Sequence, residues 1–345
     1  MTKVLYITPN GVANRSPQID MAEFLSQRFE KLDLLVYGTS RIPDLQTSYD
    51  VVFAAMEACI PYAYEISQKM GIPIYSHWEW IPPFRIFGYP GGDDPLKWGF
   101  QEGDAKHLYK NKSFYSKYDK IIKCSINSNI NSCAGVSFKE SAVKFSNNKM
   151  DNCFIKYPHA TINLNKERNN KKRNYFITVS RLVPNKLVYK IAEAVRCANL
   201  KTTWVIVGSG PEQHRIENLF KDSNTEVKFF SNINGEKKYT LLSGALFQLS
   251  AWHGLPQLEA ALVGVPTINY NIEYIKELYG DTLVWVDNEK EMSEKIKELF
   301  SVAIGGKSLA YLSDPLYESA TNNLLNINTM EQSADIIEET LRKIL

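Results

Sequence analysis

Short apolar runs alternate with segments of helical period along the whole chain. The apolar runs have strand length and are rich in Val, Ile, Phe and Tyr, which favours buried strands. These runs are 4–7, 32–37, 51–54, 74–76, 120–124, 175–179, 203–207, 227–230, 245–249, 267–270 and 283–286. Helical period predicts helices near 18–30, 60–70, 185–198, 211–220, 235–243, 255–263, 272–279, 288–302 and 329–345. Such alternation predicts parallel sheets with helices on both faces.

A polar, basic stretch interrupts this rhythm between residues 161 and 173. Its sequence from 163 onward, N-L-N-K-E-R-N-N-K-K-R, has no apolar periodicity and is typical of an interdomain linker. A chain of 345 residues is also too long for one comfortable core. We therefore predict an α/β protein with two tandem Rossmann-like, doubly wound domains, 1–160 and 174–328, that face a central cleft. The helix at 329–345 is expected to pack back on the first domain.

Composition excludes several classes of protein. A net charge of +2 gives no electrostatic reason to expect binding to nucleic acid. No apolar run has the length of a membrane span, and the first residues lead directly into a strand without a signal segment. The five cysteines are scattered and include no C-x-x-C pair, which argues against a zinc site or a disulfide framework. We expect a cytoplasmic protein without a metal.

The first candidate site is the segment 180–186, S-R-L-V-P-N-K, which follows a strand and opens a helix. Arg181 and Lys186 can converge on one anion there, and the helix N-terminus adds unpaired N–H groups. Two solvated charges around a turn are the alternative. The second candidate is V-G-S-G-P-E at 207–212, in which Gly208 and Gly210 form a glycine turn before a helix. A lone G-x-G is also compatible with a simple tight turn.

The third candidate is the segment 250–260, S-A-W-H-G-L-P-Q-L-E-A. Gly254 allows a ligand to approach the backbone, and the free amides of the first helical turn, which begins at Leu255, suit a diphosphate. Glu259 lies one turn into this helix, where its carboxylate could accept two ribose hydroxyls. A helix-dipole carboxylate above a core turn is the alternative.

In this order and spacing, the three segments resemble the family-four retaining glycosyltransferases of the GT-B fold. The third segment continues as A-L-V-G-V-P-T-I to residue 268, as in that family. The resemblance is strong over about 175–285, and the first half shares only the β–α rhythm. It implies that Arg181 and Lys186 hold the leaving diphosphate, that Gly254 and Leu255 cradle the phosphates, and that Glu259 binds the ribose. Further donor-binding residues would be Gly208, Gly210, Ile233 beside the nucleobase, and His253 in the sugar pocket.

One position departs from the family's pattern, which commonly has a glutamate eight residues before Glu259, where this chain has Ala251. In the first half, the resemblance places an acceptor-binding loop at 10–15, with Gly11 and Arg15 as candidates. It also places His77, after the strand at 73–76, in a catalytic role as a polar partner of the reacting sugar. An exposed loop arginine is the alternative at Arg15.

The leading hypothesis is a hexosyltransferase-like enzyme that moves a sugar from a UDP- or GDP-sugar to an acceptor hydroxyl with retention and without a metal. The acceptor would be a glycan, a lipid-linked compound or another hydroxyl compound, with peripheral membrane contact as a further expectation. Two alternatives stay open: a catalytically weakened protein that binds nucleotide sugars, and a nucleotide-sugar epimerase on the same fold. An NAD oxidoreductase is disfavoured because the dinucleotide glycine fingerprint is absent.

Overall fold

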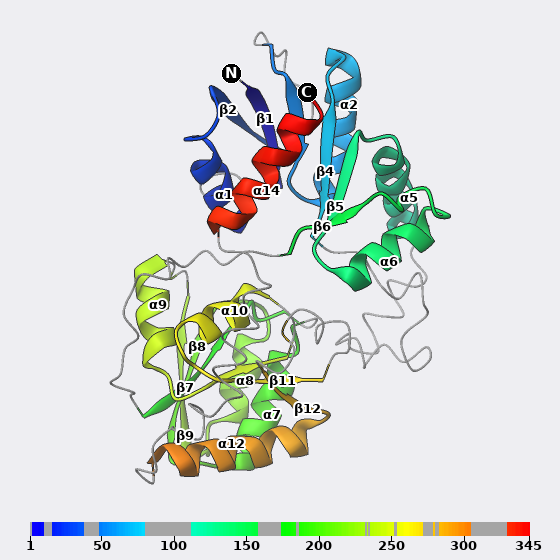
Figure 1. Ribbon diagram of the computed structural model, residues 1–345. Helices are drawn as coiled ribbons and strands as arrows, with labels where there is room; N and C mark the ends of the chain where they lie inside the picture. Colours follow the sequence, from blue (N-terminus) through cyan, green and yellow to red (C-terminus); the bar gives the residue numbers. More distant parts are fainter. Residues whose placement is uncertain are drawn as a thin grey trace. The chain divides into compact units, whose positions relative to one another are not determined.

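The computed structural model describes residues 2–9, 16–37, 48–79, 112–157, 174–183, 186–231, 233, 235–251, 254–271, 279, 283–304 and 330–345. These residues form two compact units. Unit 1 contains the described residues from 2 to 157 and from 330 to 345, and unit 2 contains those from 174 to 304. Figure 1 shows that each unit has a sheet with helices packed around it.

Unit 1 is built on a six-stranded parallel sheet in the order β2-β1-β3-β4-β5-β6. Its strands are β1 (Lys3–Thr8), β2 (Lys31–Val36), β3 (Val51–Ala54), β4 (Ile74–Trp78), β5 (Ile130–Cys133) and β6 (Phe154–Ile155). Its helices are α1 (Pro17–Leu25), the short 3₁₀ helix η1 (Glu57–Cys59), α2 (Ile60–Met70), α5 (Lys112–Ile126), α6 (Val136–Phe145) and α14 (Met330–Lys343).

The core of unit 1 lies on both faces of this sheet. On one face Tyr6, Phe53 and Tyr75 form an aromatic row, in which the rings of Phe53 and Tyr75 stack with their centroids 4.6 Å apart. Helices α1 and α14 cover this face. On the other face α2 packs against β3 and β4, burying residues such as Ile60 and Ile66. Strands β1, β3 and β4 are therefore buried on both sides, as their continuous apolar runs indicate.

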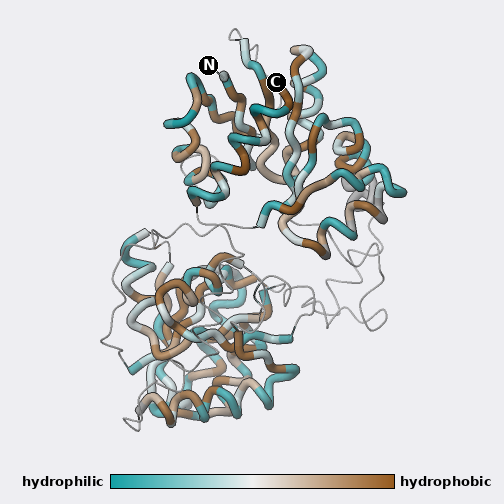
Figure 2. Tube along the Cα trace, in the orientation of Figure 1, coloured by the Kyte–Doolittle hydropathy of each residue, from teal (hydrophilic) through white to brown (hydrophobic). Residues whose placement is uncertain are grey.

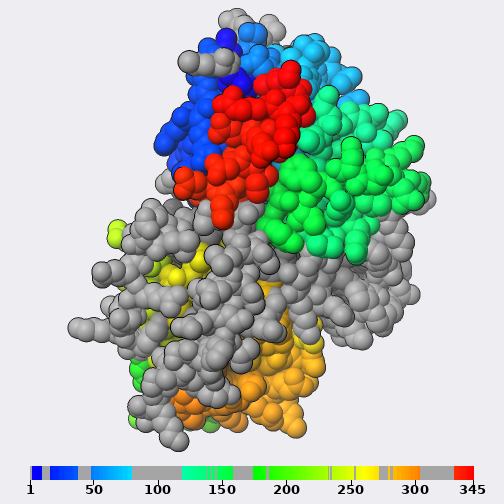
Figure 3. Space-filling model, viewed as in Figure 1, coloured from blue at the N-terminus to red at the C-terminus, as the bar shows by residue number. Residues whose placement is uncertain are grey.

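The C-terminal helix α14 belongs to unit 1 although it follows unit 2 in the sequence. Ala334, Ile337 and Leu341 are buried in the same cluster as the aromatic row. Arg28, just after α1, forms an ion pair with Asp335 of α14. Figure 3 shows α14 in red, lying over the surface of unit 1 beside the first, blue part of the chain. The helix thus closes one face of the sheet of unit 1.

Unit 2 contains a second six-stranded parallel sheet, in the order β12-β11-β10-β7-β8-β9. Its strands are β7 (Tyr175–Val179), β8 (Thr202–Val207), β9 (Thr225–Phe230), β10 (Gln248–Ser250), β11 (Thr267–Tyr270) and β12 (Leu283–Val286). Its helices are α7 (Val188–Ala198), α8 (Gln213–Leu219), α9 (Gly235–Gly244), α10 (Leu255–Leu262) and α12 (Glu289–Ile304).

Helices cover both faces of the sheet of unit 2. Residues of α9 and α10, including Leu242 and Ala260, join Ile177 and Val205 in one cluster. On the opposite face the rings of Phe176 and Trp204 stack, and the ring of Phe220, which follows α8, packs against Trp204. Helix α12 packs on α7. Hydrophobic and hydrophilic positions alternate along α12 in Figure 2, as expected of a helix with one buried side. Both sheets are therefore doubly wound, which confirms the predicted fold class.

Most predicted elements are present, but the apolar run at 120–124 is not a strand. It lies within α5, where Ile121, Ile122 and Cys124 are buried while Lys120 and Lys123 are exposed. The strand prediction here was wrong. Periodicity cannot distinguish a strand from a buried helix segment when the apolar run is this short. Strands β5 and β6 and helix α6 were not predicted, and the first helix ends at Leu25, earlier than predicted.

Candidate functional site

A pocket of about 170 Å³ lies in unit 2 at the point where the strand order reverses. Strand β7 lies in the middle of the sheet, with β8 on one side and β10 on the other. The loops that leave β7 and β10 therefore diverge, and they leave a crevice at the carboxyl ends of the strands. The pocket is lined by Thr178, Val179, Ser180, Arg181, Lys186, Val188, Ile191, Ser250, Ala251, Gly254, Pro256 and Gln257.

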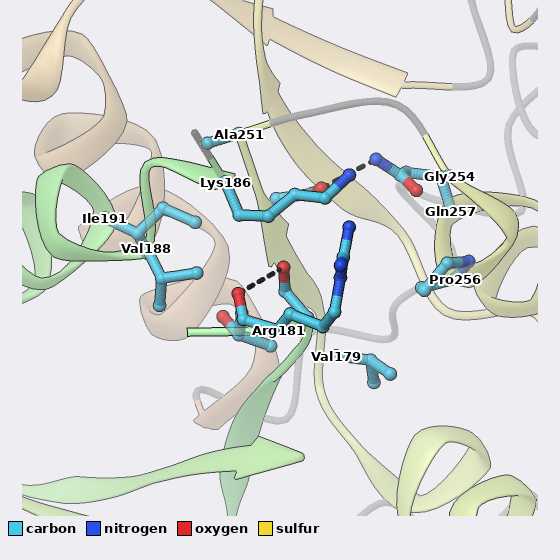
Figure 4. Close-up of a pocket in the computed structure, with 12 residues that line it drawn as sticks. Val179, Arg181, Lys186, Val188, Ile191, Ala251, Gly254, Pro256 and Gln257 are labelled. Atoms are coloured by element: carbon cyan, nitrogen blue, oxygen red, sulfur yellow. Dashed lines mark hydrogen bonds between the residues drawn. The ribbon is translucent and has the colours of Figure 1, made fainter. Parts of the chain in front are cut away.

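Two cationic side chains share this pocket. Arg181 directly follows β7, and Lys186 lies at the turn into α7. Figure 4 shows the end of the Arg181 side chain pointing toward the end of the Lys186 side chain. The turn is held by a hydrogen bond from the Lys186 amide to the Val183 carbonyl, at 2.9 Å. The structure thus brings together the two cations that the first motif singles out.

The backbone at Leu187 is part of how the turn places Lys186. Leu187 has a φ of 53°, a left-handed conformation that costs a residue other than glycine about 1–3 kcal/mol. Its side chain is buried, so packing offsets that cost. The strained residue forms the N-cap of α7, directly after Lys186. Strain of this kind gathers at ligand sites.

The pocket is electrostatically unbalanced within its described lining, which contains two cations and no carboxylate. Burial, and then the neighbouring charge of Arg181, lowers the pKa of Lys186 to about 8. An anion between the two groups would raise the pKa of Lys186 again, because a nearby negative charge favours the protonated amine. A phosphate group has the charge and the hydrogen-bond acceptors for this position.

The glycine turn of the second motif packs against the Arg181 segment. A Cβ on Gly208 would lie 1.9 Å from the Ser180 carbonyl oxygen, and one on Gly210 would lie 2.3 Å from the Leu182 carbonyl oxygen. The Leu182 amide donates to the Ser209 carbonyl at 2.9 Å. Neither glycine lines the described pocket. These glycines are needed because two backbone segments pass in contact, and they position the loop that carries Arg181.

The N-terminus of α10 forms the opposite wall of the pocket. Gly254 is the N-cap, Leu255 is the first residue of the helix and Pro256 follows it. The backbone of Gly254 is extended, so no left-handed conformation requires a glycine at this position. The hydroxyl of Tyr279 donates to the Gly254 carbonyl at 2.8 Å, which fixes the entry into the helix. An anion at this wall of the pocket would face the positive end of the helix dipole.

Gln257 is a pocket residue whose side chain was not predicted to contribute to the site. Its side-chain amide nitrogen donates to Ser250 Oγ at 2.6 Å and lies 3.3 Å from Asn269 Oδ1. Gln257 therefore joins the carboxyl ends of β10 and β11 to α10. No local pattern in the sequence indicates such a side-chain link.

Glu259 is fully buried and forms an ion pair with Lys238 of α9, with Nζ 2.7 Å from Oε1. Lys238 lies 21 positions away on another helix, and no local pattern indicates this partner. Ile233, the predicted nucleobase contact, packs against the hydrophobic cluster beneath α9 and α10. The ribose and nucleobase roles of these two residues stay predictions.

His77 lies on β4 of unit 1, with 1% of its surface exposed. Its Nδ1 is 2.7 Å from Ser132 Oγ, and its Nε2 is 3.4 Å from Glu79 Oε1. Burial, and then the positive charge of Lys156, lowers the pKa of His77 to about 4. The imidazole is therefore neutral at pH 7, inside a buried polar cluster of unit 1.

The remaining predicted residues, Gly11, Arg15 and His253, lie outside the described residues. Among the residues that the structure does describe, no three His, Cys, Asp or Glu side chains come together as a metal site would require. The helices within those same residues include none that is long and apolar enough to cross a bilayer.

The sequence of unit 2 matches a known family. Residues 160–310 match the family described as glycosyl transferases group 1. This range contains the pocket and all three motifs. No curated protein matches the chain significantly.

Solved structures with the same fold match nearly the whole chain. HepE of Anabaena, crystallised with UDP-glucose, is 12% identical and gives a TM-score of 0.71 over 99% of this chain and 100% of its own. A glycosyltransferase of Rickettsia africae gives 0.62 at 13% identity, covering 99% and 98% of the two chains. TarM of S. aureus, crystallised with UDP and alpha-GlcNAc-glycerol, gives 0.59 at 15% identity over 84% of this chain and 55% of its own. At these identities the likeness shows the fold.

Proposed function

We propose that this chain is a glycosyltransferase and that its donor is a UDP- or GDP-sugar bound at the pocket of unit 2, within the range that matches glycosyl transferases group 1. The observation that carries the proposal is the pairing of Arg181 and Lys186 in one pocket beside the N-terminus of α10. Two cations and a row of helix amides form a receptor for a diphosphate. HepE and TarM were both crystallised with UDP, which supports uridine as the base.

In the proposed reaction, Arg181 and Lys186 stabilise the diphosphate as it leaves the sugar. The transition state places positive charge on the sugar ring and negative charge on the departing phosphate oxygens. Cations that are already in place lower the free energy of this state without reorganisation. They also supply the charge that a divalent ion would supply, so we propose a reaction without a metal. Transfer would continue in the presence of a chelator.

The pocket volume limits how much of the donor it holds. A volume of about 170 Å³ is below the range of about 300–1,000 Å³ typical of pockets that enclose a drug-sized ligand. It suits the diphosphate and the first atoms of the sugar. We assign the ribose to Glu259, the nucleobase to Ile233, the phosphates to Gly254 and Leu255, and further donor contacts to His253, Gly208 and Gly210.

We propose transfer with retention to a hydroxyl of a glycan, a lipid-linked compound or another acceptor, with His77 as a polar partner of the reacting sugar and Gly11 and Arg15 as acceptor contacts. Retention is proposed from the family's motifs. The acceptor class follows from the reaction type, and the TarM crystal with a glycosylated glycerol is compatible with it. The anomeric configuration of the product, read by NMR, tests retention.

Ala251 keeps one alternative in view. It is buried in the pocket wall, where it offers no polar group to a sugar. A protein that binds nucleotide sugars without transferring them would have this arrangement. Incubation with UDP-glucose and with a GDP-sugar, each together with hydroxyl acceptors, distinguishes the cases. Free nucleoside diphosphate with a glycosylated acceptor marks a transferase, a changed sugar still joined to the nucleotide marks an epimerase, and unchanged donor marks a binding protein.

The first experiment is calorimetry with UDP, GDP, ADP, CMP and NAD on the full chain. We expect tight binding of UDP or GDP, and loss of binding in Arg181→Ala with Lys186→Ala. The control is Lys221→Ala with Lys228→Ala, which removes two exposed positive charges of unit 2 that do not line the pocket. If NAD binds best, if no nucleotide binds, or if both double variants lose affinity equally, the assignment of this pocket is wrong.

A further inference from the structure

Two buried cysteines lie against each other at the edge of the unit 1 sheet. Cys133 ends β5, and Cys153 directly precedes β6, the edge strand. Cys133 is in register with Ile155, which places the turn before β6 beside the end of β5. The two Sγ atoms are 3.1 Å apart, and both residues have 0% of their surface exposed. All five cysteines of the chain are described, and this is the one sulfur–sulfur contact among them.

The contact brings the sulfur atoms close to bonding distance. A disulfide bond is about 2.0 Å long, so the two atoms need to approach by about 1 Å. The residues are 20 positions apart in the sequence, so the pairing of β5 with β6 creates this dithiol, and no C-x-x-C spacing marks it. A bond between them would close a loop that contains α6, the helix that packs against β5 and β6.

Cys153 is the thiol that a local opening of the chain exposes first. The turn before it, 147–152, is exposed except at Met150. Asn147 and Asn148 have left-handed φ values of 52° and 64°, a conformation that asparagine tolerates better than most residues. The Cys153 amide donates to the Met150 carbonyl at 3.1 Å. Since β6 has two residues and lies at the sheet edge, this segment can open without unfolding the core.

Thiol–disulfide exchange then proceeds in two steps. The Cys153 thiolate attacks one sulfur of a small disulfide such as oxidised glutathione, which gives a mixed disulfide and releases one glutathione thiolate. In the closed pair, the hydrogen bond to Cys153 and then burial raise the pKa of Cys133, so Cys133 keeps its proton. The mixed disulfide removes the first of these causes. The Cys133 thiolate can then attack the Cys153 sulfur and displace the second glutathione thiolate.

The exchange is balanced in electrons and protons. The two cysteines lose two electrons and two protons in all, and the oxidant takes up both to become two molecules of glutathione. We propose that Cys133 and Cys153 are a reversible modification site, which a small disulfide oxidant converts to a disulfide that ties the turn before β6 to the end of β5. The proposal rests on unit 1 alone and is independent of the donor assigned to unit 2.

The test is thiol mapping of the folded, full chain after incubation with oxidised glutathione. Remaining thiols are blocked with N-ethylmaleimide in denaturant, and tandem mass spectrometry of a tryptic digest locates the disulfides. We expect two peptides joined through Cys133 and Cys153. Cys124 lies on the same tryptic peptide as Cys133, so Cys124→Ser is the matched control and should keep the joined pair.

Two further variants test the order of the steps. Cys133→Ser should stop at a mixed disulfide on Cys153, and Cys153→Ser should leave Cys133 without glutathione. Cys197 is exposed and should take up glutathione in all these variants, which shows that the reagent is active. Absence of the joined pair while Cys197 is modified would overturn the proposal. A pair that forms equally through Cys124 would overturn it as well, because the geometry would then have no role.

Hydrogen exchange measures what the bond does to unit 1. Amides of α6 and of the turn 147–152 should exchange about 10-fold more slowly or less in the oxidised protein, because a closed loop has fewer open conformations. Dithiothreitol should restore the faster exchange. Equal exchange in the oxidised and reduced forms would overturn the role of the bond in holding this segment on the sheet.

Discussion

Gly208 passes so close to Ser180 that a Cβ on the glycine would lie 1.9 Å from the serine carbonyl oxygen. The Ser180 amide in turn donates to the Val207 carbonyl at 3.0 Å. The loop after β7 and the loop after β8 are therefore locked together as backbones. Because Arg181 follows Ser180 directly, this contact sets the position of the backbone that carries the guanidinium into the pocket.

Gly208→Ala should therefore destabilise unit 2 and weaken nucleotide binding together. Contact with backbone atoms cannot be relieved by a rotamer change, so we expect a loss of about 3 kcal/mol or more in the free energy of unfolding. The control is Gly235→Ala, which also has a positive φ, 55°, but has no atom within 4 Å of the added Cβ. It should cost only about 1 kcal/mol. Equal losses in the two variants, measured by denaturant titration, would contradict the close-packing role.

The affinity for UDP should fall as the pH rises through about 8. Below this value Lys186 is charged and pairs with the diphosphate; above it the free protein carries a neutral amine. Bound diphosphate raises the pKa again, so the loss is gradual. Lys186→Arg should show a flat profile, because guanidinium stays charged over this range. Calorimetry between about pH 7 and 9.5 measures both profiles, and a flat wild-type profile would argue that Lys186 does not meet the phosphates.

Lys238 and Glu259 should be energetically coupled. Lys238→Met removes the ion-pair partner of a fully buried carboxylate, and we expect the free energy of unfolding to fall by about 2 kcal/mol. The loss should be smaller than for a fully buried pair because Lys238 is partly exposed. Glu259→Gln removes the charge that needs the partner. The double variant should therefore be more stable than the sum of the two losses predicts. A double-mutant cycle from urea denaturation measures this coupling, and strict additivity would show that the ion pair contributes nothing.

Helix α14 should contribute strongly to the stability of unit 1. Ile337 is buried among the residues of α1 and the aromatic row, so Ile337→Ala should cost about 2–5 kcal/mol in the free energy of unfolding. Glu339→Ala, an exposed position on the same helix, is the matched control and should cost less than about 0.5 kcal/mol. Limited proteolysis of unit 1 should be faster in the first variant. Equal stability of the two variants would show that α14 adds little to the core.

The neutral state of His77 predicts a loss of stability in acid. Its pKa is about 4 in the folded protein against 6.5 for an ordinary histidine, so the unfolded chain binds a proton first as the pH falls. Stability should decrease between about pH 6.5 and 4, by up to about 3 kcal/mol from this group. In His77→Gln this part of the decrease should be absent. The measurement is the free energy of unfolding as a function of pH, compared between the wild type and the variant. Parallel profiles would mean that His77 titrates normally.

Local patterns predicted the parts of the site that lie within one continuous segment. The cations at 181 and 186 share one loop, and the glycines at 208 and 210 mark one turn, so spacing alone was informative. The same reasoning failed at 120–124, where a short apolar run fits a strand as well as a buried helix turn. It also gave no indication of Lys238, because ion-pair partners on different helices leave no periodic trace.

The sequence by itself determined the β–α alternation, the division into two Rossmann-like sheets, and the loops that carry charge at the ends of strands. These follow from residue size, polarity and period over a few turns. Only the tertiary structure decided that β10 lies beside β7, which brings Ala251 and Gln257 to the same pocket as Arg181. Only register decided that Ser132 faces His77. Strand order and register depend on pairings between residues far apart in the chain, and no local pattern encodes these.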